Sequence, residues 1–395
     1  MLDSSANPTS GLLEHYKRIE FSLIDGWMDD DHAAAMACFR VTARKLLDKE
    51  YQQGYLGPQL ADLANAARTS LDGTYGGRVT NTSAKEFFET FFVPYRHVGQ
   101  IGTNGDNTIP ADADKPLFKG FVTGYFEPEI DASLVKTARF THPFYSRPPD
   151  LVEVDPPAIL MDGGEAMQFA RQKSDGLVPY FDRAEIDQGA LEGKGLEIAW
   201  IEKPVDAFFI HIQGSARLRF ADGTVRRLSY SAKNGHPYTA VGSILVRNGV
   251  ISKEQLTMET LRNWMELDQA AAARLMHQNR SFIFFDLQEE TDPALGPIGA
   301  ASVPLTPGRS LAIDHKLFTY GMPVWLATKT PLPGQSGRFR RLMISQDTGS
   351  AIKGPARGDI FVGSGYEAGM VAGSIKHACD FIVFMPVTFT GSVEQ

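Results

Sequence analysis

Short apolar runs separated by glycine and proline fill the last third of the chain, and this pattern constrains the fold more than any other feature. The runs are too short for ordinary helices and are rich in β-branched and aromatic residues, so they predict strands. The predicted strands are Phe282–Phe285, Ser310–Ile313, Pro323–Ala327, Arg341–Ser345, Asp359–Val362 and Phe381–Pro386. Six short strands within about 105 residues favour a small barrel over alternating strands and helices.

The first hundred residues are predicted to be mostly helical. Asp30 stands where it can cap a helix that runs to about Leu47. Ser83-Ala-Lys-Glu86 matches a capping box, and an apolar stripe begins directly after it at Phe87.

A β-rich region is predicted from about residue 117 to about residue 250. Its strands are Phe121–Tyr125, Leu196–Ile201, Ala207–Gln213 and a hairpin formed by Arg217–Phe220 and Thr224–Tyr230. His211 falls in the third of these segments, where a lone histidine is usually structural. Ser252-Lys-Glu-Gln255 matches another capping box and predicts a helix that runs to about Gln278.

Charge and composition exclude several classes of function. The 39 basic and 47 acidic residues give a formal charge of −8, which is unlike a general nucleic-acid-binding protein. Cys38 and Cys379, the two cysteines, are too few for a disulfide scaffold or a Cys-rich zinc site, and both are expected to be buried. The nine histidines show no metal-binding spacing, so neither a metal nor a cofactor is expected.

Two short motifs suggest chemistry that the rest of the sequence does not support. Asp347-Thr-Gly-Ser350 matches the aspartic-protease signature, but that reaction needs two carboxylates about 3 Å apart and the chain has no second motif. Gly363-Ser-Gly-Tyr-Glu-Ala368 fits a dinucleotide-binding turn, but the 27 residues after it are too few for the fold that this turn requires. A turn into a helix that starts near Tyr366 is the simpler interpretation.

Three aspartates, Asp314, Asp347 and Asp359, each lie beside a short apolar strand in the C-terminal region. Aspartate is unfavourable in strands, so this repeated placement needs a reason. One reason is the capping of turns, which aspartate commonly does. The other is convergence in a cleft, where like charges raise the pKa of at least one carboxyl and so prepare it to act as a general acid.

Several longer segments are similar to a known family. Four of them resemble the three-aspartate domain, a double-psi β-barrel: Val303–Asp314, Tyr320–Trp325, Gln346–Gly354 and Gly358–Gly369. Four more resemble the inserted domain and the return segment of the membrane-bound lytic murein transglycosylase A family: Thr123-Gly-Tyr-Phe-Glu-Pro128, Ile210–Ser215, Tyr230–Tyr238 and Gln278–Phe285. The matches run in order from about residue 117 to residue 386.

The resemblance implies a mainly β, α+β fold with two domains. Residues 1–116 and 280–395 would form the double-psi β-barrel domain with N-terminal helices. Residues 117–279 would form an inserted β-rich domain, and a glycan groove would lie between the two. The chain is expected to act as a monomer.

The resemblance also assigns roles to individual residues. Asp359 would be the catalytic acid, Asp347 would assist it, and Asp314 would hold barrel loops in place. The positions that would line the glycan groove are Thr123, Tyr125, Gln213 and Ser215. Lys233 and Asn234 belong to a family motif without an assigned role.

The implied reaction cleaves the β-1,4 bond between N-acetylmuramic acid and N-acetylglucosamine in peptidoglycan. A single aspartate would act first as acid and then as base, and the product would carry a 1,6-anhydromuramic acid end. Two alternatives stay open: a peptidoglycan hydrolase that uses water, and a non-catalytic glycan-binding wall protein. We expect the protein to act in the periplasm in association with the outer membrane, and the reading frame upstream of Met1 to encode an export signal.

Overall fold

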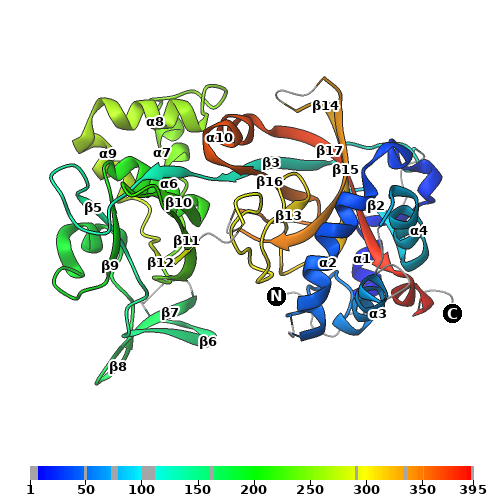
Figure 1. The fold of residues 1–395 in the computed structure, drawn as a ribbon, viewed down its shortest axis with the longest axis horizontal. Coiled ribbons are helices and arrows are strands. Elements are labelled where there is room, and N and C mark those ends of the chain that lie inside the picture. The colour runs from blue at the N-terminus through cyan, green and yellow to red at the C-terminus, as the bar shows by residue number, and fades with distance from the viewer. Residues whose placement is uncertain are drawn as a thin grey trace. The chain divides into compact units, whose positions relative to one another are not determined.

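The chain divides into two compact units, which are described separately below (Figure 1). The structure is a computed structural model that describes residues 8–48, 51–72, 79–99, 112–160, 164, 166–289, 292–332, 336–349 and 351–392. The barrel domain comprises Met1–Phe126, Ala294–Gly363 and Glu367–Gln395. The inserted domain comprises Glu127–Pro293 together with Ser364–Tyr366.

A closed ring of strands forms the centre of the barrel domain. Its members are β3 (Gly120–Glu127), β13 (Ser310–Ala312), β14 (Pro323–Pro331), β15 (Arg338–Asp347), β16 (Arg357–Ser364) and β17 (Lys376–Pro386). The strand order is β17-β14-β15-β13-β16-β3, and the pairing of β3 with β17 closes the ring. Five of the six strands predicted after residue 281 lie in this ring, so the predicted barrel is confirmed.

Two more strands and most of the helices complete the barrel domain. The strands β1 (Tyr16–Arg18) and β2 (Phe92–His97) extend the sheet beyond β17, whose residues 382–386 pair with β2 while residues 376–379 pair with β3. The α-helices are α1 (Pro8–Leu13), α2 (His32–Asp48), α3 (Leu60–Leu71), α4 (Asn81–Phe91) and α10 (Gly365–Ser374). The 3-10 helices are η1 (Phe21–Leu23), η2 (Trp27–Asp29) and η4 (Val387–Ser392).

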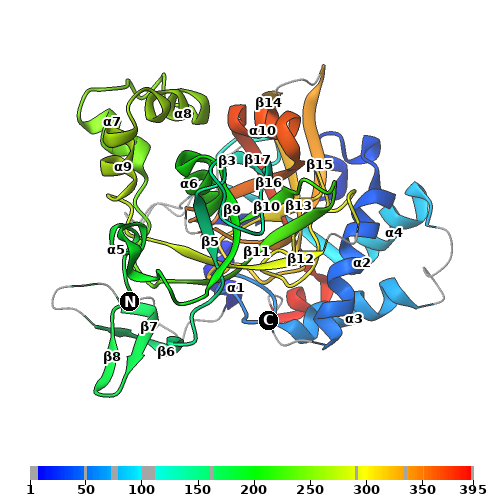
Figure 2. The same ribbon diagram turned by 60° about the vertical axis from the view of Figure 1, so that its left-hand side comes forward.

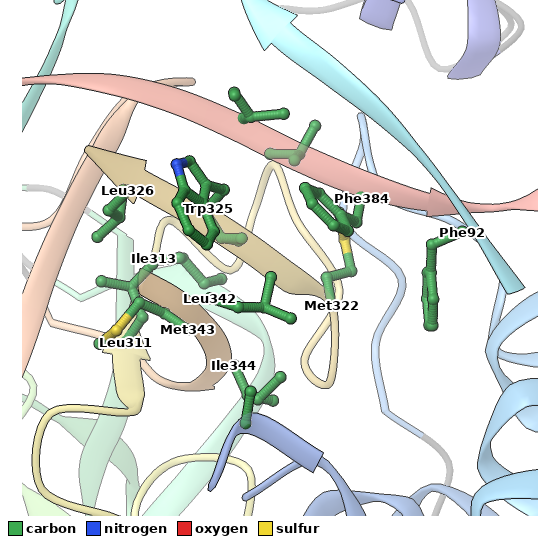
Figure 3. Packing of buried hydrophobic residues seen from close by; sticks show 14 of the residues in the cluster. Phe92, Leu311, Ile313, Met322, Trp325, Leu326, Leu342, Met343, Ile344 and Phe384 are labelled. Atoms are coloured by element: carbon green, nitrogen blue, oxygen red, sulfur yellow. The ribbon is translucent and has the colours of Figure 1, made fainter. Parts of the chain in front are cut away.

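Aromatic and branched side chains fill the centre of this domain (Figure 3). Trp325 on β14 is fully buried, and its ring lies 5.4 Å from that of Trp27. Phe87 and Phe88 on α4 are also fully buried and contact Phe39 on α2, as the predicted apolar stripe requires. Burial of side chains of this size contributes roughly 1.5–3 kcal/mol each.

The predicted helix caps are displaced, by one residue at α2 and by three residues at α4. The side chain of Asp31, rather than that of Asp30, accepts a hydrogen bond from the Ala34 backbone amide at the start of α2. Asp30 instead forms a buried ion pair with Arg309 at 2.8 Å and accepts a hydrogen bond from the Leu342 amide. These tertiary bonds occupy both of its oxygens, so the adjacent aspartate caps the helix. The helix α4 likewise begins after a Thr80–Ser83 box and not after Ser83.

The inserted domain contains three small sheets. Its strands are β4 (Glu129–Asp131), β5 (His142–Tyr145), β6 (Leu151–Ile159), β7 (Ala166–Lys173), β8 (Gly176–Val178), β9 (Glu197–Ile201), β10 (Ser215–Arg219), β11 (Val225–Lys233) and β12 (Ile283–Glu289). The sheet orders are β12-β11-β10-β4, β5-β9 and β6-β7-β8. The predicted hairpin is confirmed as the antiparallel pair β10–β11.

The helices of the inserted domain are α5 (Arg183–Glu185), the π-helical turn η3 (Ile186–Ala190), α6 (Pro204–Gln213), α7 (Val241–Arg247), α8 (Met258–Leu267) and α9 (Gln269–Met276). Three of these helices, α7, α8 and α9, lie together (Figure 2). The Ser252 hydroxyl accepts a hydrogen bond from the Gln255 amide at 3.3 Å, but the prediction that a helix begins there is wrong, because α8 begins at Met258 behind a Thr257 cap. The single helix expected to reach Gln278 is divided at Asp268, whose side chain caps α9.

The segment Ala207–Gln213 is a helix and not the predicted strand. Pro204 occupies the first turn of α6, and Gly214 ends the helix with a φ of 83°. Phe208 and Ile210 pack into different apolar clusters, so α6 is buried on more than one side. A short, fully apolar run does not distinguish a buried helix from a buried strand. His211 lies on this helix, is buried and contacts the Phe282 ring, which agrees with a structural role.

The inserted domain begins 10 residues later and ends 14 residues later than predicted. The domain boundaries lie at residues 126/127 and 293/294, whereas the resemblance implied 116/117 and 279/280. The first boundary moves because residues 120–123 of β3 pair with β17 in the barrel. The second moves because β12 pairs with β11, so the predicted strand Phe282–Phe285 belongs to the inserted domain and not to the barrel.

Two further sequence expectations can be compared with the structure. Both Cys38 and Cys379 are buried free thiols, as predicted. Within the described residues, no helix is long and apolar enough to cross a membrane.

Removal of the Asp30 carboxylate tests the packing of the helices on the barrel. Asp30→Ala leaves Arg309 buried without its counter-ion, so we expect the free energy of unfolding to fall by about 3–5 kcal/mol. The matched control is Asp114→Ala in the exposed pair with Lys17, which should cost about 0–1 kcal/mol. Chemical denaturation of both variants measures the difference, and equal losses would contradict the role given to Asp30.

Candidate active site

Two neighbouring strands of the barrel carry the principal site residues. Alternate residues of a strand point to the same face. Thr123 and Tyr125 therefore share one face of β3, and Arg357, Asp359 and Phe361 share one face of β16. Since β3 and β16 are hydrogen-bonded neighbours, the two sets lie next to each other.

The residue between Thr123 and Tyr125 is Gly124, and the packing of β3 requires a glycine at this position. It lies on the opposite face of β3, where a Cβ atom would come within 2.8 Å of the Ile375 side chain and 3.0 Å of the Ala372 Cα atom. The absence of a side chain at residue 124 therefore lets β3 approach the end of α10 closely.

Asp359 is half-buried and has one hydrogen-bond partner among the described residues. The Thr123 hydroxyl donates to its Oδ1 at 2.5 Å. Within that part of the chain, Oδ2 of Asp359 accepts no hydrogen bond. One carboxylate oxygen is thus held by the protein, and the other is available to another molecule.

Asp347 has partners on both of its oxygens. The Tyr125 hydroxyl donates to Oδ2 at 2.7 Å, and the Ala300 backbone amide donates to Oδ1 at 3.0 Å. The Tyr125 ring lies 5.3 Å from the Phe361 ring, which fixes the direction of its hydroxyl. Asp347 is therefore held in place by the protein itself.

The register of a short strand brings the two carboxylates to one end of the barrel. Ala312 on β13 lies opposite Asp347 on β15 and opposite Asp359 on β16. Each carboxylate has its own hydrogen-bond donor, and no hydrogen bond joins the two within the described residues. This arrangement differs from the shared proton of an aspartic-protease dyad.

The surroundings of Asp359 adjust its acidity to a value useful near neutral pH. Burial raises the pKa of Asp359 to about 6, the hydrogen bond from Thr123 and the charge of Arg357 oppose that rise, and the negative charge of Asp347 adds to it. Burial also raises the pKa of Asp347. The pKa of Tyr125 is raised well above its ordinary value, first by burial and then by Asp347, so its phenol stays neutral and can donate a hydrogen bond.

Asp314 holds loops together and, among the described residues, makes no hydrogen bond to either of the other two aspartates. Its Oδ2 accepts a hydrogen bond from the Gly354 amide at 2.9 Å, and its Oδ1 accepts one from the Lys316 amide at 3.2 Å. Lys353 lies 4.0 Å away. These bonds join the loop after β13 to the loop before β16, and the structural role that the resemblance implied stays a prediction.

The other predicted binding residues lie in the inserted domain. Gln213 ends α6 and is half-buried, and its amide lies 3.9 Å from the Met258 sulfur. Ser215 begins β10 and is buried opposite Ser229. Their contact with a glycan stays a prediction, as does the role of Lys233 at the end of β11.

Asn234 has a structural role within the inserted domain. It is fully buried, and its amide donates to the carbonyl oxygens of Phe181 and Arg280 at 2.9 Å. Its side-chain oxygen accepts hydrogen bonds from the amides of His236 and Phe282. These bonds occupy the side chain and join three segments of the chain.

Sequence reasoning missed Arg357 and Ala300. Arg357 donates to the Thr123 hydroxyl at 2.7 Å and lies two residues before Asp359 on the same strand face. That spacing was a usable signal, because residues i and i+2 of a strand are neighbours on one face. Ala300 contributes a backbone amide, which a sequence does not distinguish from any other. Among the described residues, no cluster of His, Cys, Asp or Glu could hold a metal ion.

Comparisons with known proteins show which family the chain belongs to. Residues 121–286 match the family model described as the MltA specific insert domain, and residues 309–385 match the 3D domain. A crystal structure of a membrane-bound lytic murein transglycosylase from Agrobacterium tumefaciens is 34% identical, with a TM-score of 0.84 over 96% of this chain and 99% of that one. The chain belongs to the membrane-bound lytic murein transglycosylase A family.

Two further members of the family are similar to the chain. Membrane-bound lytic murein transglycosylase A of Escherichia coli K12 is 34% identical over 65% of this chain, and the alignment spans 62% of the length of that relative. The structure of E. coli MltA with bound chitohexaose is 25% identical, with a TM-score of 0.62 over 93% of this chain and 90% of that one.

The raised pKa of Asp359 predicts a pH-dependent cost to stability. The folded-state pKa of Asp359 is about 6 and exceeds its ordinary value of 3.8, so the folded state binds this proton more tightly than the unfolded state does. The resulting contribution to the free energy of unfolding is fully present below about pH 4 and is lost as the pH rises through 6. Asp359→Asn does not ionise, so we expect it to be more stable than the wild type by about 2–3 kcal/mol at pH 7.5 and nearly equal to it at pH 3.5.

Denaturation of both proteins at these two pH values measures the effect. The same substitution at Asp175, an exposed turn residue, is the control. Equal stability of Asp359→Asn and the wild type at pH 7.5 would contradict the environment described for Asp359.

Proposed function

We propose that this chain is a lytic transglycosylase. It would cleave the β-1,4 bond between N-acetylmuramic acid and N-acetylglucosamine in peptidoglycan and leave a 1,6-anhydromuramic acid end. Membership of the transglycosylase family supports this assignment of substrate and reaction.

The unequal hydrogen bonding of the two carboxylates is the observation that carries the mechanism. Asp347 accepts a bond on each oxygen, whereas Asp359 retains one oxygen without a partner among the described residues. Glycosidases of the usual kind need two working carboxylates, one acid and one base or nucleophile. A site with a single available carboxyl suits a reaction in which the substrate supplies its own nucleophile.

In the first step, neutral Asp359 donates its proton to the glycosidic oxygen as the bond to the muramoyl C1 breaks. The leaving sugar then ends in a hydroxyl group, and the muramoyl ring takes on oxocarbenium character. A pKa of about 6 leaves a useful fraction of Asp359 protonated near neutral pH.

In the second step, ionised Asp359 removes the proton from the muramoyl C6 hydroxyl. At the same time, the C6 oxygen bonds to C1 of the same sugar. This step restores neutral Asp359, and water is not consumed. Holding the ring so that C6–OH faces C1 provides the entropic advantage of an intramolecular reaction. Asp347 would assist through its charge, which keeps the pKa of Asp359 high.

The glycan-binding residues are proposed with two different kinds of role. The Thr123 hydroxyl proton is directed at Asp359, so this residue would act mainly on the acid. Tyr125 offers a ring edge to a sugar while its hydroxyl holds Asp347. Gln213 and Ser215 would hydrogen-bond to sugar hydroxyl or acetamido groups along the glycan groove.

Location follows from the proposed substrate. Peptidoglycan lies in the periplasm, and the E. coli relative is described as membrane-bound. We propose that this protein acts in the periplasm in association with the outer membrane.

The proposal predicts that Asp359→Asn gives no anhydro product. Asparagine has nearly the same shape but does not donate the required proton, and loss of a general acid typically lowers the rate by about 10²–10⁴-fold. Purified sacculi, digested and analysed by mass spectrometry, should give products one water lighter than reducing ends with the wild-type protein only. Asp314→Asn is the matched control and should lower the melting temperature while retaining the product.

Two results would contradict this proposal. Near wild-type turnover by Asp359→Asn would exclude Asp359 as the acid. Reducing ends in place of anhydro ends would indicate a hydrolase, and absence of any turnover by the wild type would favour a glycan-binding protein.

Asp347→Asn tests the proposed electrostatic assistance. Removal of a like charge lowers the pKa of Asp359, so the limb on which kcat/KM falls with rising pH should move to lower pH by several tenths of a unit. Activity at the optimum should fall less than in Asp359→Asn. A limb that stays in place would show that Asp347 acts in some other way.

A further inference from the structure

Arg357 is held against the acid by contacts on three sides. One guanidinium nitrogen, Nη2, donates to the Thr123 hydroxyl at 2.7 Å, and the other, Nη1, donates to the Gly358 carbonyl oxygen. The guanidinium carbon lies 5.5 Å from the centre of the Phe121 ring. Three contacts on a half-buried side chain restrict its motion, which a solvent-exposed arginine does not require.

We infer that Arg357 is a positioning residue that acts through Thr123 and determines which oxygen of Asp359 carries the catalytic proton. The inference deepens the proposed transglycosylase function and rests on it. It concerns the orientation of a single hydroxyl group on β3.

The chemistry of the donors defines that orientation. A guanidinium group donates hydrogen bonds and does not accept them. The Thr123 hydroxyl must therefore accept from Arg357, and its own single proton remains for another partner. Oδ1 of Asp359 lies 2.5 Å from the Thr123 oxygen and receives that proton.

This orientation makes the two oxygens of Asp359 unequal. Oδ1 already accepts the Thr123 proton, so it is the less favourable position for the carboxyl proton. The proton of neutral Asp359 is therefore placed on Oδ2, the oxygen that has no partner within the described residues. That is the oxygen from which it can reach a glycosidic oxygen.

The groups around Asp359 show why a cation is needed here. Asp347 on β15 and Tyr125 on β3 both interact electrostatically with Asp359. The thiol of Cys379 on β17 is near Arg357, and burial raises its pKa, so it stays neutral. Lys376 lies opposite Thr123 in the register and is exposed.

Arg357 therefore counteracts the negative charge of Asp347. The pKa of Asp359 is raised by that charge and lowered by the guanidinium. Without Arg357, the pKa of Asp359 would rise, which moves the pH profile, and the Thr123 hydroxyl would be free to turn, which lowers kcat.

Titration of Asp359 in the intact protein tests the coupling without substrate. In protein labelled with ¹³C-aspartate, the Asp359 carboxyl resonance is assigned by its absence in Asp359→Asn. Arg357→Met should move its titration to higher pH by about one unit. Arg357→Lys keeps the positive charge, so its titration should lie at least halfway back from that of Arg357→Met to that of the wild type. Arg44→Met, at an exposed position on α2, should leave the titration unchanged.

Turnover of sacculi tests the positioning. Arg357→Met should lower kcat by roughly tenfold and change KM less than twofold, and its descending pH limb should move to higher pH. In a Thr123→Val background, the same substitution should change kcat less than twofold at the optimum, because the hydroxyl through which it acts is absent.

Three results would overturn the inference: an unshifted Asp359 titration in Arg357→Met, a kcat within twofold of the wild type, or equal losses with and without Thr123. If Arg357→Met does not fold, Arg357→Gln keeps a donor amide without the charge and should show the same direction of titration. A wild-type protein that yields no anhydro product would refute the proposed function, whereas the titration would still decide whether Arg357 controls Asp359.

Discussion

The rest of the site depends on the pairing of β3 with β17, which closes the barrel. Cys379 lies opposite Gly120 and Lys376 lies opposite Thr123 in this pairing. A Cβ atom at residue 120 would stand 2.8 Å from the Phe381 Cβ atom and 3.0 Å from the Cys379 sulfur, so glycine permits the close approach. Because the side chains of a strand alternate between its faces, a slip of one residue would turn Thr123 and Tyr125 away from the two carboxylates.

Closure of the barrel also explains why Asp347 and Asp359 differ in their hydrogen bonds. Both lie opposite Ala312, one on each neighbouring strand of β13. Both oxygens of Asp347 accept hydrogen bonds, from Tyr125 and from the Ala300 amide. Only one oxygen of Asp359 accepts a hydrogen bond within the described residues, from Thr123. The fold thus holds one carboxylate by hydrogen bonds on both oxygens and leaves one oxygen of its neighbour without a partner among the described residues. Ionised Asp359 costs stability in such an environment, which is a common cost of an active site.

The strands of the barrel and the aspartates at their ends could be predicted from the sequence for a clear physical reason. Runs such as Pro323–Ala327 combine buried apolar residues with glycine or proline boundaries, so their period and length are visible locally. The roles proposed for Asp359 and Asp347 rest on the family motifs and stay predictions. The helix at Ala207–Gln213 was missed because it is buried on more than one side and lacks a helical period. The capping role of Asp30 was wrong because its partner, Arg309, lies 279 residues away in the chain.

The hydrogen bonds of the site could not be predicted from the sequence either, because they join residues that lie far apart in the chain. The contact between Arg357 and Thr123 spans 234 residues, and the bond from Tyr125 to Asp347 spans 222. A sequence shows the types of these residues but not which of them meet. Pairing of strands that lie far apart in the chain provides that information, and the unequal hydrogen bonding of the two aspartates follows from it.

Cleavage in ¹⁸O-labelled water tests most directly whether a single carboxyl and an internal nucleophile are sufficient. The account predicts that muramoyl ends released by the wild-type protein contain no ¹⁸O, because the C6 oxygen of the same sugar closes onto C1. Incorporation of one ¹⁸O atom at C1 during cleavage would show that water is the nucleophile and would contradict the one-carboxyl mechanism built on Asp359.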